Sequence, residues 1–203
     1  MPDGDIFEKV KAGKASVVTD EIERFTEKGI LLKSGQELEA DIVVTATGFS
    51  LSVLGDIPFS VDGKAVNWAD TVTYRGMMFS GVPNMAWVFG YFRASWTLRV
   101  DLMADFVCRL LKHMQAKGAK EVTVEPPAGM ELSDWIDPEN FNPGYLMRSM
   151  HKMPKRGDRH EWQHTQDYWA ERTEFPAIDL DGAEFVYSAP TSAAAKTKAV
   201  EPA

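Results

Sequence analysis

The stretch Asp41-Ile42-Val43-Val44-Thr45-Ala46-Thr47-Gly48 decides the fold class that this sequence predicts. Its β-branched and small residues follow one another without polar alternation, which indicates a strand buried on both faces, as in a parallel sheet. The closing glycine would let a ligand approach the backbone closely. We therefore expect an α/β protein with a ligand near Gly48.

A second strand-then-helix pattern lies in the middle of the chain. Residues 82–90 form an apolar run that ends at Gly90, and we expect a strand there. After Ser95, apolar residues recur at three- and four-residue steps for several turns, which predicts a long amphipathic helix with Arg99 on its polar face. Ser95 is the expected N-cap, and Gly118 is the expected C-terminal stop.

Shorter elements flank these two patterns. A helix over 5–12 and β-prone pieces from Ser16 to Leu38 predict a helix followed by an antiparallel meander. Further elements are expected, in chain order, as strands at 57–61, 70–75 and 121–124 and helices at 142–151 and 163–173. From Ser188 onward the chain lacks an apolar stripe, which predicts a disordered tail.

Composition excludes several functional classes. The 203 residues are 44% hydrophobic and 11% aromatic, which is typical of a packed globular chain. The net charge of −8 opposes a nucleic-acid partner, because phosphates are bound by clustered Lys and Arg. The single cysteine, Cys108, cannot form an internal disulfide, and no apolar run approaches the ~20 residues of a membrane span. We expect a cytoplasmic protein without a membrane span.

The connection from Val82 to Thr97 is the first candidate site. A helix N-terminus presents unpaired N–H groups and a partial positive charge, which suit an anionic or electron-rich ligand. An ordinary strand-to-helix connection explains the same pattern. The chain contains no G-x-G-x-x-G motif and no Walker loop, so it lacks a dinucleotide phosphate cradle of its own.

His160-Glu161-Trp162-Gln163-His164 spells H-E-x-x-H, a second candidate site. On a helix, two such histidines can share one zinc ion while the glutamate acts as general base. The flanking residues are charged and loop-like, and no third ligand follows at a known spacing. We therefore expect no metal and keep a zinc hydrolase only as the least favoured alternative.

Several separated motifs occur along residues 1–187. They are Pro2-Asp3-Gly4-Asp5-Ile6-Phe7, Ala40 to Gly48, Gly81 to Gly90, Ala94-Ser95-Trp96-Thr97-Leu98, Val107 to Leu111, Asn142-Pro143-Gly144-Tyr145 and Met153-Pro154-Lys155. In this order they resemble the C-terminal part of class B flavoprotein monooxygenases of the Baeyer–Villiger type, in particular those that activate the prodrug ethionamide.

The resemblance implies a three-layer fold with two dinucleotide-binding domains, of which this chain would supply the returning half of the FAD domain. Residues 1–120 would form that half, including the β-meander. Residues 121–187 would form a C-terminal extension packed on it, and residues 188–203 the disordered tail. The glycine-rich fingerprints for both cofactors lie in a part of the family's sequence that is not matched here.

The resemblance also implies a function. In such enzymes NADPH reduces FAD, O2 adds to the flavin, and the flavin peroxide transfers one oxygen atom to a ketone, sulfur or nitrogen centre of a small organic substrate. FAD and NADPH are thus the implied cofactors. The residues implied to contact the flavin, with the helix N-terminus pointing at the ring, are Gly48, Gly90, Ser95, Trp96 and Thr97.

The family's catalytic arginine lies before the region that matches Pro2-Asp3-Gly4-Asp5, so no catalytic residue is assigned to this chain. Arg93 does not occupy the matching position. We expect the chain to be inactive without an N-terminal half. The alternative is a non-catalytic interaction or vestigial domain, which would self-associate through apolar surface that the other half would cover.

Overall fold

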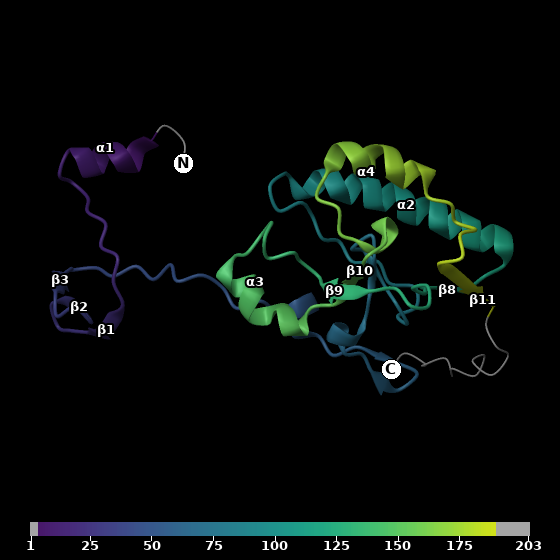
Figure 1. The fold of residues 1–203 in the computed structure, drawn as a ribbon, viewed down its shortest axis with the longest axis horizontal. Helices are drawn as coiled ribbons and strands as arrows, with labels where there is room; N and C mark the ends of the chain where they lie inside the picture. The colour runs from purple at the N-terminus through teal and green to yellow at the C-terminus, as the bar shows by residue number, and fades with distance from the viewer. Residues whose placement is uncertain (1–3, 190–203) are drawn as a thin grey trace, which may run out of the picture. The chain divides into compact units, whose positions relative to one another are not determined.

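The computed structural model describes residues 4–189, and the chain forms two compact units, Met1–Gly48 and Phe49–Ala203 (Figure 1). Both units combine helices and strands, as expected for the α/β class. The complete two-domain flavoprotein fold and the division into residues 1–120 and 121–187 stay predictions. The tail expected from residue 188 lies, from residue 190 onward, outside the described residues.

The first unit consists of one helix and a three-stranded antiparallel meander, as predicted. Its elements are α1 (Asp5–Lys11), β1 (Ile22–Phe25), β2 (Gly29–Leu32) and β3 (Glu37–Glu39). Gly29 starts β2 where a Cβ would lie 2.9 Å from the Ala40 nitrogen, so only a glycine fits between the strands. Residues 16–19, expected as a further strand, are not in a strand.

The strand predicted at residues 41–48 is wrong. These residues have no regular secondary structure and all are exposed, with Ile42 81% and Val44 83% accessible. A strand that is apolar on both faces is stable only between neighbours that pair with its backbone and cover both faces. No described strand pairs with residues 41–48, so their backbone groups are left to water.

The second unit contains the long helix, small sheets and short helices. The elements are η2 (Val53–Asp56), β4 (Ser60–Val61), β5 (Lys64–Ala65), η3 (Trp68–Asp70), β6 (Thr73–Tyr74), β7 (Met78–Phe79), α2 (Trp96–Lys117), β8 (Glu121–Val124), β9 (Leu132–Asp134), α3 (Gly144–Ser149), η4 (Met150–Lys152), β10 (Lys155–Gly157), η5 (His160–Trp162), α4 (Tyr168–Glu174), η6 (Phe175–Ala177) and β11 (Phe185–Ser188). The strands form two-stranded antiparallel sheets, β4-β5, β6-β7, β9-β10 and β8-β11.

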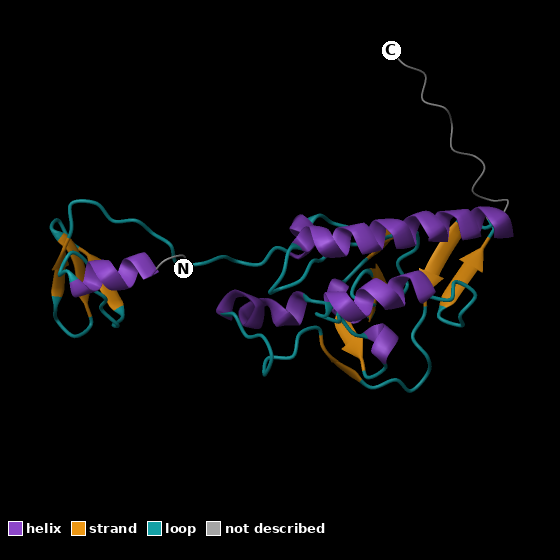
Figure 2. Ribbon diagram, turned by 90° about the horizontal axis from the view of Figure 1, so that it is seen from above, coloured by secondary structure: helices purple, strands orange, loops and turns teal. Residues whose placement is uncertain are grey.

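Helix α2 organises the first of two hydrophobic clusters. Its buried stripe of Met103, Phe106, Leu110 and Met114 packs with residues of β8 and β11, and α4 lies beside α2 (Figure 2). Gly118 ends the helix in the left-handed conformation, with φ of 66°, as predicted. Residues of β8, α4, η6 and β11 thus lie against the long helix, and Ser188, expected in the tail, still pairs with Glu121 in β11.

A second cluster is rich in aromatic side chains. Trp68, Phe79 and Trp135 are buried there with Leu146 of α3 and Met153. The Trp87 ring lies between Phe79 and Trp135, with centroid distances of 5.6 and 5.5 Å and nearly parallel planes. This cluster supports the loops on either side of α3 and the segment that leads into α2.

The strand predicted at residues 82–90 is also wrong. Pro83 has no N–H to donate, and Asn84 adopts a positive φ of 55°, so the run cannot continue a ladder. Single backbone bonds hold it instead, from Asn84 N to Val122 O and from Trp87 N to Met77 O. The helix predicted at 163–173 begins only at Tyr168, because Asp167 caps it by accepting from the backbone nitrogens of Trp169 and Ala170.

Candidate functional site

The N-terminus of α2 brings three of the predicted residues together. Ser95 occupies the N-cap position, but its hydroxyl lies 2.7 Å from the Thr97 hydroxyl and caps no backbone N–H. Residues 93–97 are all exposed, and the first turn carries no acidic side chain. The first turn therefore keeps donor groups and positive potential that an electron-rich ligand can use.

Gly90 is the fourth predicted residue at this place, and its role is steric. A Cβ at Gly90 would lie 2.5 Å from Trp96 Cδ2, so only a glycine lets the indole pack here. Trp96 also contacts Phe89 at a centroid distance of 5.0 Å, yet half of its side chain stays exposed. The indole is thus held in place with a free face. Gly48, the fifth predicted residue, belongs to the first unit, and a Cβ there would contact nothing.

A buried ion pair anchors the first turn of α2. Arg99 Nε donates to Glu171 Oε2 on α4 at 2.9 Å, and the two side chains are 0% and 1% exposed. The Arg99 guanidinium also donates to the backbone oxygens of Phe89 and Arg75, at 2.8 and 2.6 Å. The helical pattern placed Arg99 on the polar face, and this prediction is wrong, because the long helix is covered by α4 on that side.

Tyr91 joins this pair to the segment before α2. Its hydroxyl donates to Glu171 Oε2 at 2.5 Å. Burial of the phenol, and then its hydrogen bond to Glu171, raise the pKa of Tyr91 above its usual range. Tyr91 therefore stays protonated and acts as a fixed donor that ties the segment behind Gly90 to α4.

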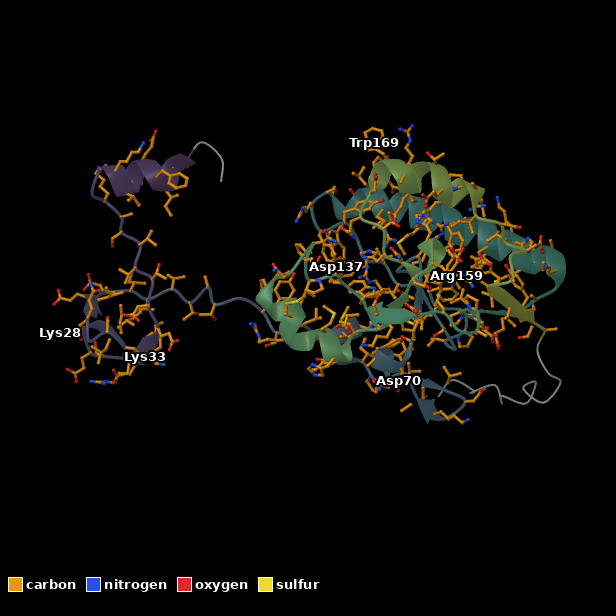
Figure 3. The ribbon with its side chains drawn as sticks, in the orientation of Figure 1. Lys28, Lys33, Asp70, Asp137, Arg159 and Trp169 are labelled. Atoms are coloured by element: carbon orange, nitrogen blue, oxygen red, sulfur yellow. The ribbon has the colours of Figure 1, made fainter. Side chains whose placement is uncertain are left out.

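A cavity of about 530 Å³ opens beside the segment that leads into α2. Its walls come from that segment, from the loop before α3, and from β10 and the stretch between β10 and α4; Figure 3 labels Asp137 in the loop before α3. The lining residues are Tyr91, Phe92, Arg93, Ala94, Trp135, Ile136, Asp137, Asn140, Phe141, Arg156, His160, Gln163, His164, Thr165 and Gln166. The sequence analysis missed this cavity, because its walls are far apart along the chain.

The two histidines of the H-E-x-x-H string line this cavity but do not form a metal site. His160 lies in the short helix η5, and its Nε2 is 2.8 Å from Glu174 Oε2. His164 lies beyond η5, and its ring stacks on Trp135 at 5.0 Å. The two rings are therefore not on one helix face, as zinc binding by this string requires. Within residues 4–189 no three His, Cys, Asp or Glu side chains are grouped to hold a metal ion.

The surroundings of His164 keep its ring neutral. Phe89 and Phe92 contact it edge-on at 5.2 and 5.7 Å, in addition to the stacked Trp135. Burial among these rings, and then the charge of Arg99, lower the pKa of His164 well below its usual value near 6.5. At neutral pH His164 is an aromatic wall of the cavity and contributes no charge.

No helix in the described part of the chain is both long enough and apolar enough to cross a membrane. No family model matches the sequence, and no solved structure matches it.

Curated proteins do match. The chain is 48% identical over 168 residues to "FAD-containing monooxygenase EthA" of Mycobacterium tuberculosis, and 46% identical over 174 residues to "Probable FAD-binding monooxygenase AlmA" of an Acinetobacter species. A third relative, "Putative FAD-containing monooxygenase MymA" of Mycobacterium tuberculosis, is 43% identical over 168 residues. The alignments cover 83 to 86% of this chain.

The chain spans about a third of the length of these curated relatives, 34 to 35% of each. Identity of 43% or more over most of the chain confirms the resemblance to flavoprotein monooxygenases. The chain is therefore similar, over most of its length, to about a third of the sequence of proteins named as FAD-containing or FAD-binding monooxygenases.

Proposed function

We propose that this chain forms part of an FAD- and NADPH-dependent monooxygenase of the Baeyer–Villiger type. The complete enzyme would add one oxygen atom from O2 to a ketone, sulfur or nitrogen centre of a small organic substrate. The observation that carries this proposal is the identity of 43 to 48% to three proteins named as FAD-containing or FAD-binding monooxygenases. NADPH and the class of oxygen transfer follow from the resemblance of the motifs.

The residues at the N-terminus of α2 fit a flavin. The first turn carries no acidic side chain and no side-chain cap, so its N–H groups are available to the electron-rich edge of the ring. Trp96 is half exposed and held from behind by Phe89, and the Ser95 and Thr97 hydroxyls are exposed. We assign Ser95, Trp96 and Thr97 to the flavin contact and Gly90 to the placement of Trp96.

The chemistry that bound FAD would supply is the acceptance of electrons from NADPH and the reaction with O2. The residues of this chain would bind and orient the ring, and the α2 dipole would stabilise negative charge on it. Gly48 stays a proposed cofactor contact. It would form in the complete enzyme, where other strands would pair with residues 41–48. No residue of this chain is assigned to proton transfer.

The test is a chimera in which the matched 168 residues of the Mycobacterium tuberculosis EthA are replaced by those of this chain. We expect the chimera to bind FAD and to consume NADPH and O2. Ser95→Ala and Trp96→Ala should lower FAD content per polypeptide or uncouple NADPH oxidation from product formation. Lys112→Ala, at an exposed residue further along α2, is the control. Unchanged FAD content and coupling in both variants would remove the flavin assignment.

A non-catalytic interaction domain is the second candidate. Exposed apolar side chains favour it, in particular Ile42, Val44 and Phe49, which are 81, 83 and 77% accessible. This candidate predicts self-association of the 203-residue chain and a chimera without FAD. The two candidates therefore differ in one measurement, the FAD content of the folded chimera.

A further inference from the structure

We propose that the cavity beside α2 binds a flat aromatic molecule that carries a carboxylate group. The part of the inference that makes this molecule the substrate rests on the proposed function. The binding itself depends only on residues of this chain. The cavity volume of about 530 Å³ lies within the usual range of ~300 to 1,000 Å³ for small-molecule sites.

The walls favour a flat ring. Phe92 and Phe141 stack at a centroid distance of 4.1 Å and an interplanar angle of 20°. Across the cavity lining, Trp135 and His164 stack at 5.0 Å and 12°. Trp135 is itself buried between Trp87 and His164, whereas Phe92, Phe141 and His164 are partly exposed. The faces and edges of these three rings bind a planar π-system better than a branched aliphatic group.

Two arginines supply the charge. Arg93 donates to the backbone oxygen of Asn140 at 3.0 Å, and Arg156 Nε donates to the backbone oxygen of Asp134 at 2.9 Å. Among residues 4–189 neither arginine is paired with a carboxylate. Arg99, by contrast, has a carboxylate partner. The remaining donors of Arg93 and Arg156 can therefore bind an anionic ligand.

The single acidic residue of the lining does not neutralise these arginines. Asp137 accepts instead from the Glu139 backbone N–H at 2.9 Å and from Asn140 Nδ2 at 2.7 Å. The lining is thus cationic in a protein whose net charge is −8. A guanidinium binds a carboxylate through two parallel hydrogen bonds, which makes a carboxylate the fitting anion for a small aromatic ligand.

The place of the cavity suits a substrate of the proposed enzyme. Arg93 and Ala94 belong to its wall and directly precede Ser95, where α2 begins. A ligand in the cavity would therefore lie next to the helix end assigned to the flavin. The inferred substrate class is an aromatic acid.

The experiment is a titration of the full 203-residue chain with 2-naphthoate, followed by calorimetry and tryptophan fluorescence. 2-Naphthamide, which has the same ring and no charge, is titrated in parallel. We expect saturable binding of the acid, about tenfold weaker binding of the amide, and about tenfold weaker binding of the acid by Arg156→Gln. Arg93→Gln should weaken binding of the acid in the same way. Because Arg93 is exposed, this variant should fold normally. Arg172→Gln on α4 is the control and should bind normally.

Three results would overturn the inference. They are no saturable binding, equal affinity for the acid and the amide, and equal affinity of the two cavity variants and the wild type. FAD also combines a flat ring with anionic groups, so FAD is added as a competitor. Displacement of 2-naphthoate by FAD in this chain would make the cavity part of the cofactor site and overturn the substrate assignment. A chimera without FAD would contradict the proposed function and leave the titration unaffected.

Discussion

Arg99 and Glu171 form an ion pair that is closed to solvent, with Nε and Oε2 2.9 Å apart and side chains 0% and 1% exposed. The pair joins the first turn of α2, at the helix end assigned to the flavin, to α4. Removing both charges from water is costly, and a buried pair is weak support for stability by itself. Its additional bonds to the backbone of Phe89 and Arg75 instead fix the course of the chain before α2.

Glu171→Ala should lower the free energy of unfolding by about 3 to 5 kcal/mol, because it leaves the Arg99 charge buried without a partner. Urea unfolding at pH 7 measures the change. The double variant Arg99→Met with Glu171→Leu should recover only part of the loss, because it removes both charges but leaves the Tyr91 hydroxyl and the carbonyls of Phe89 and Arg75 without these partners. A loss below about 1 kcal/mol in Glu171→Ala would mean that water reaches the pair.

Gly90→Ala should displace the Trp96 indole, because the added methyl group would lie 2.5 Å from Trp96 Cδ2. We expect a loss of about 1 to 3 kcal/mol in stability and reduced FAD content in the chimera. Gly144→Ala is the matched control, since its Cβ would meet only the mobile end of Arg148, at 3.1 Å. Trp96→Ala in the Gly90→Ala background should restore stability relative to Gly90→Ala alone. If it does not, the clash is not the cause.

Local patterns in the sequence predicted the elements that need only local contacts. The meander, α1, α2 with its end at Gly118 and β8 are confirmed, since turn residues, helical periodicity and capping act over a few residues. The strands predicted at 41–48 and 82–90 are wrong, because a buried strand depends on neighbours far along the chain. The described residues provide no partner for Val44.

The candidate site was likewise predictable only where its residues are close together in the sequence. Gly90, Ser95, Trp96 and Thr97 are close in sequence, and the structure brings them together at one helix end. Arg99 carried no signal of burial, because its partner Glu171 lies on a helix 72 residues further along the chain. The cavity was missed for the same reason. The H-E-x-x-H string, the least favoured alternative, begins in a helix of three residues that does not include His164.

His164 should make the stability of the second unit depend on pH near neutrality. Above about pH 6.5 the ring is neutral in the folded and the unfolded chain and adds no pH dependence. Below that pH the unfolded chain binds a proton, while burial and Arg99 hold the pKa of His164 lower in the folded state, so stability falls on acidification. Unfolding free energies at pH 7.5 and 5.5 measure this decrease.

His164→Phe should abolish most of that decrease, because phenylalanine keeps a ring against Trp135 and does not titrate. His151→Gln, at an exposed residue, is the control and should keep the decrease. The lowered pKa of Glu174, caused first by its bond to His160, adds a separate loss of stability only below about pH 4.5. An unchanged decrease in His164→Phe would show that another group titrates.

Val44→Asp should have opposite outcomes in the 203-residue chain and in the chimera. In the chain alone Val44 is 83% accessible, so the substitution should change stability by less than about 0.5 kcal/mol. In the chimera residues 41–48 should form the predicted strand, and a carboxylate buried on its face should lower the yield of folded, FAD-containing protein. Ile57→Asp, at a residue 58% accessible and outside this strand, is the matched control. Equal yields of the two chimeric variants would contradict the strand. A loss above about 0.5 kcal/mol caused by Val44→Asp but not by the control in the isolated chain would mean that residues 41–48 are already buried by self-association.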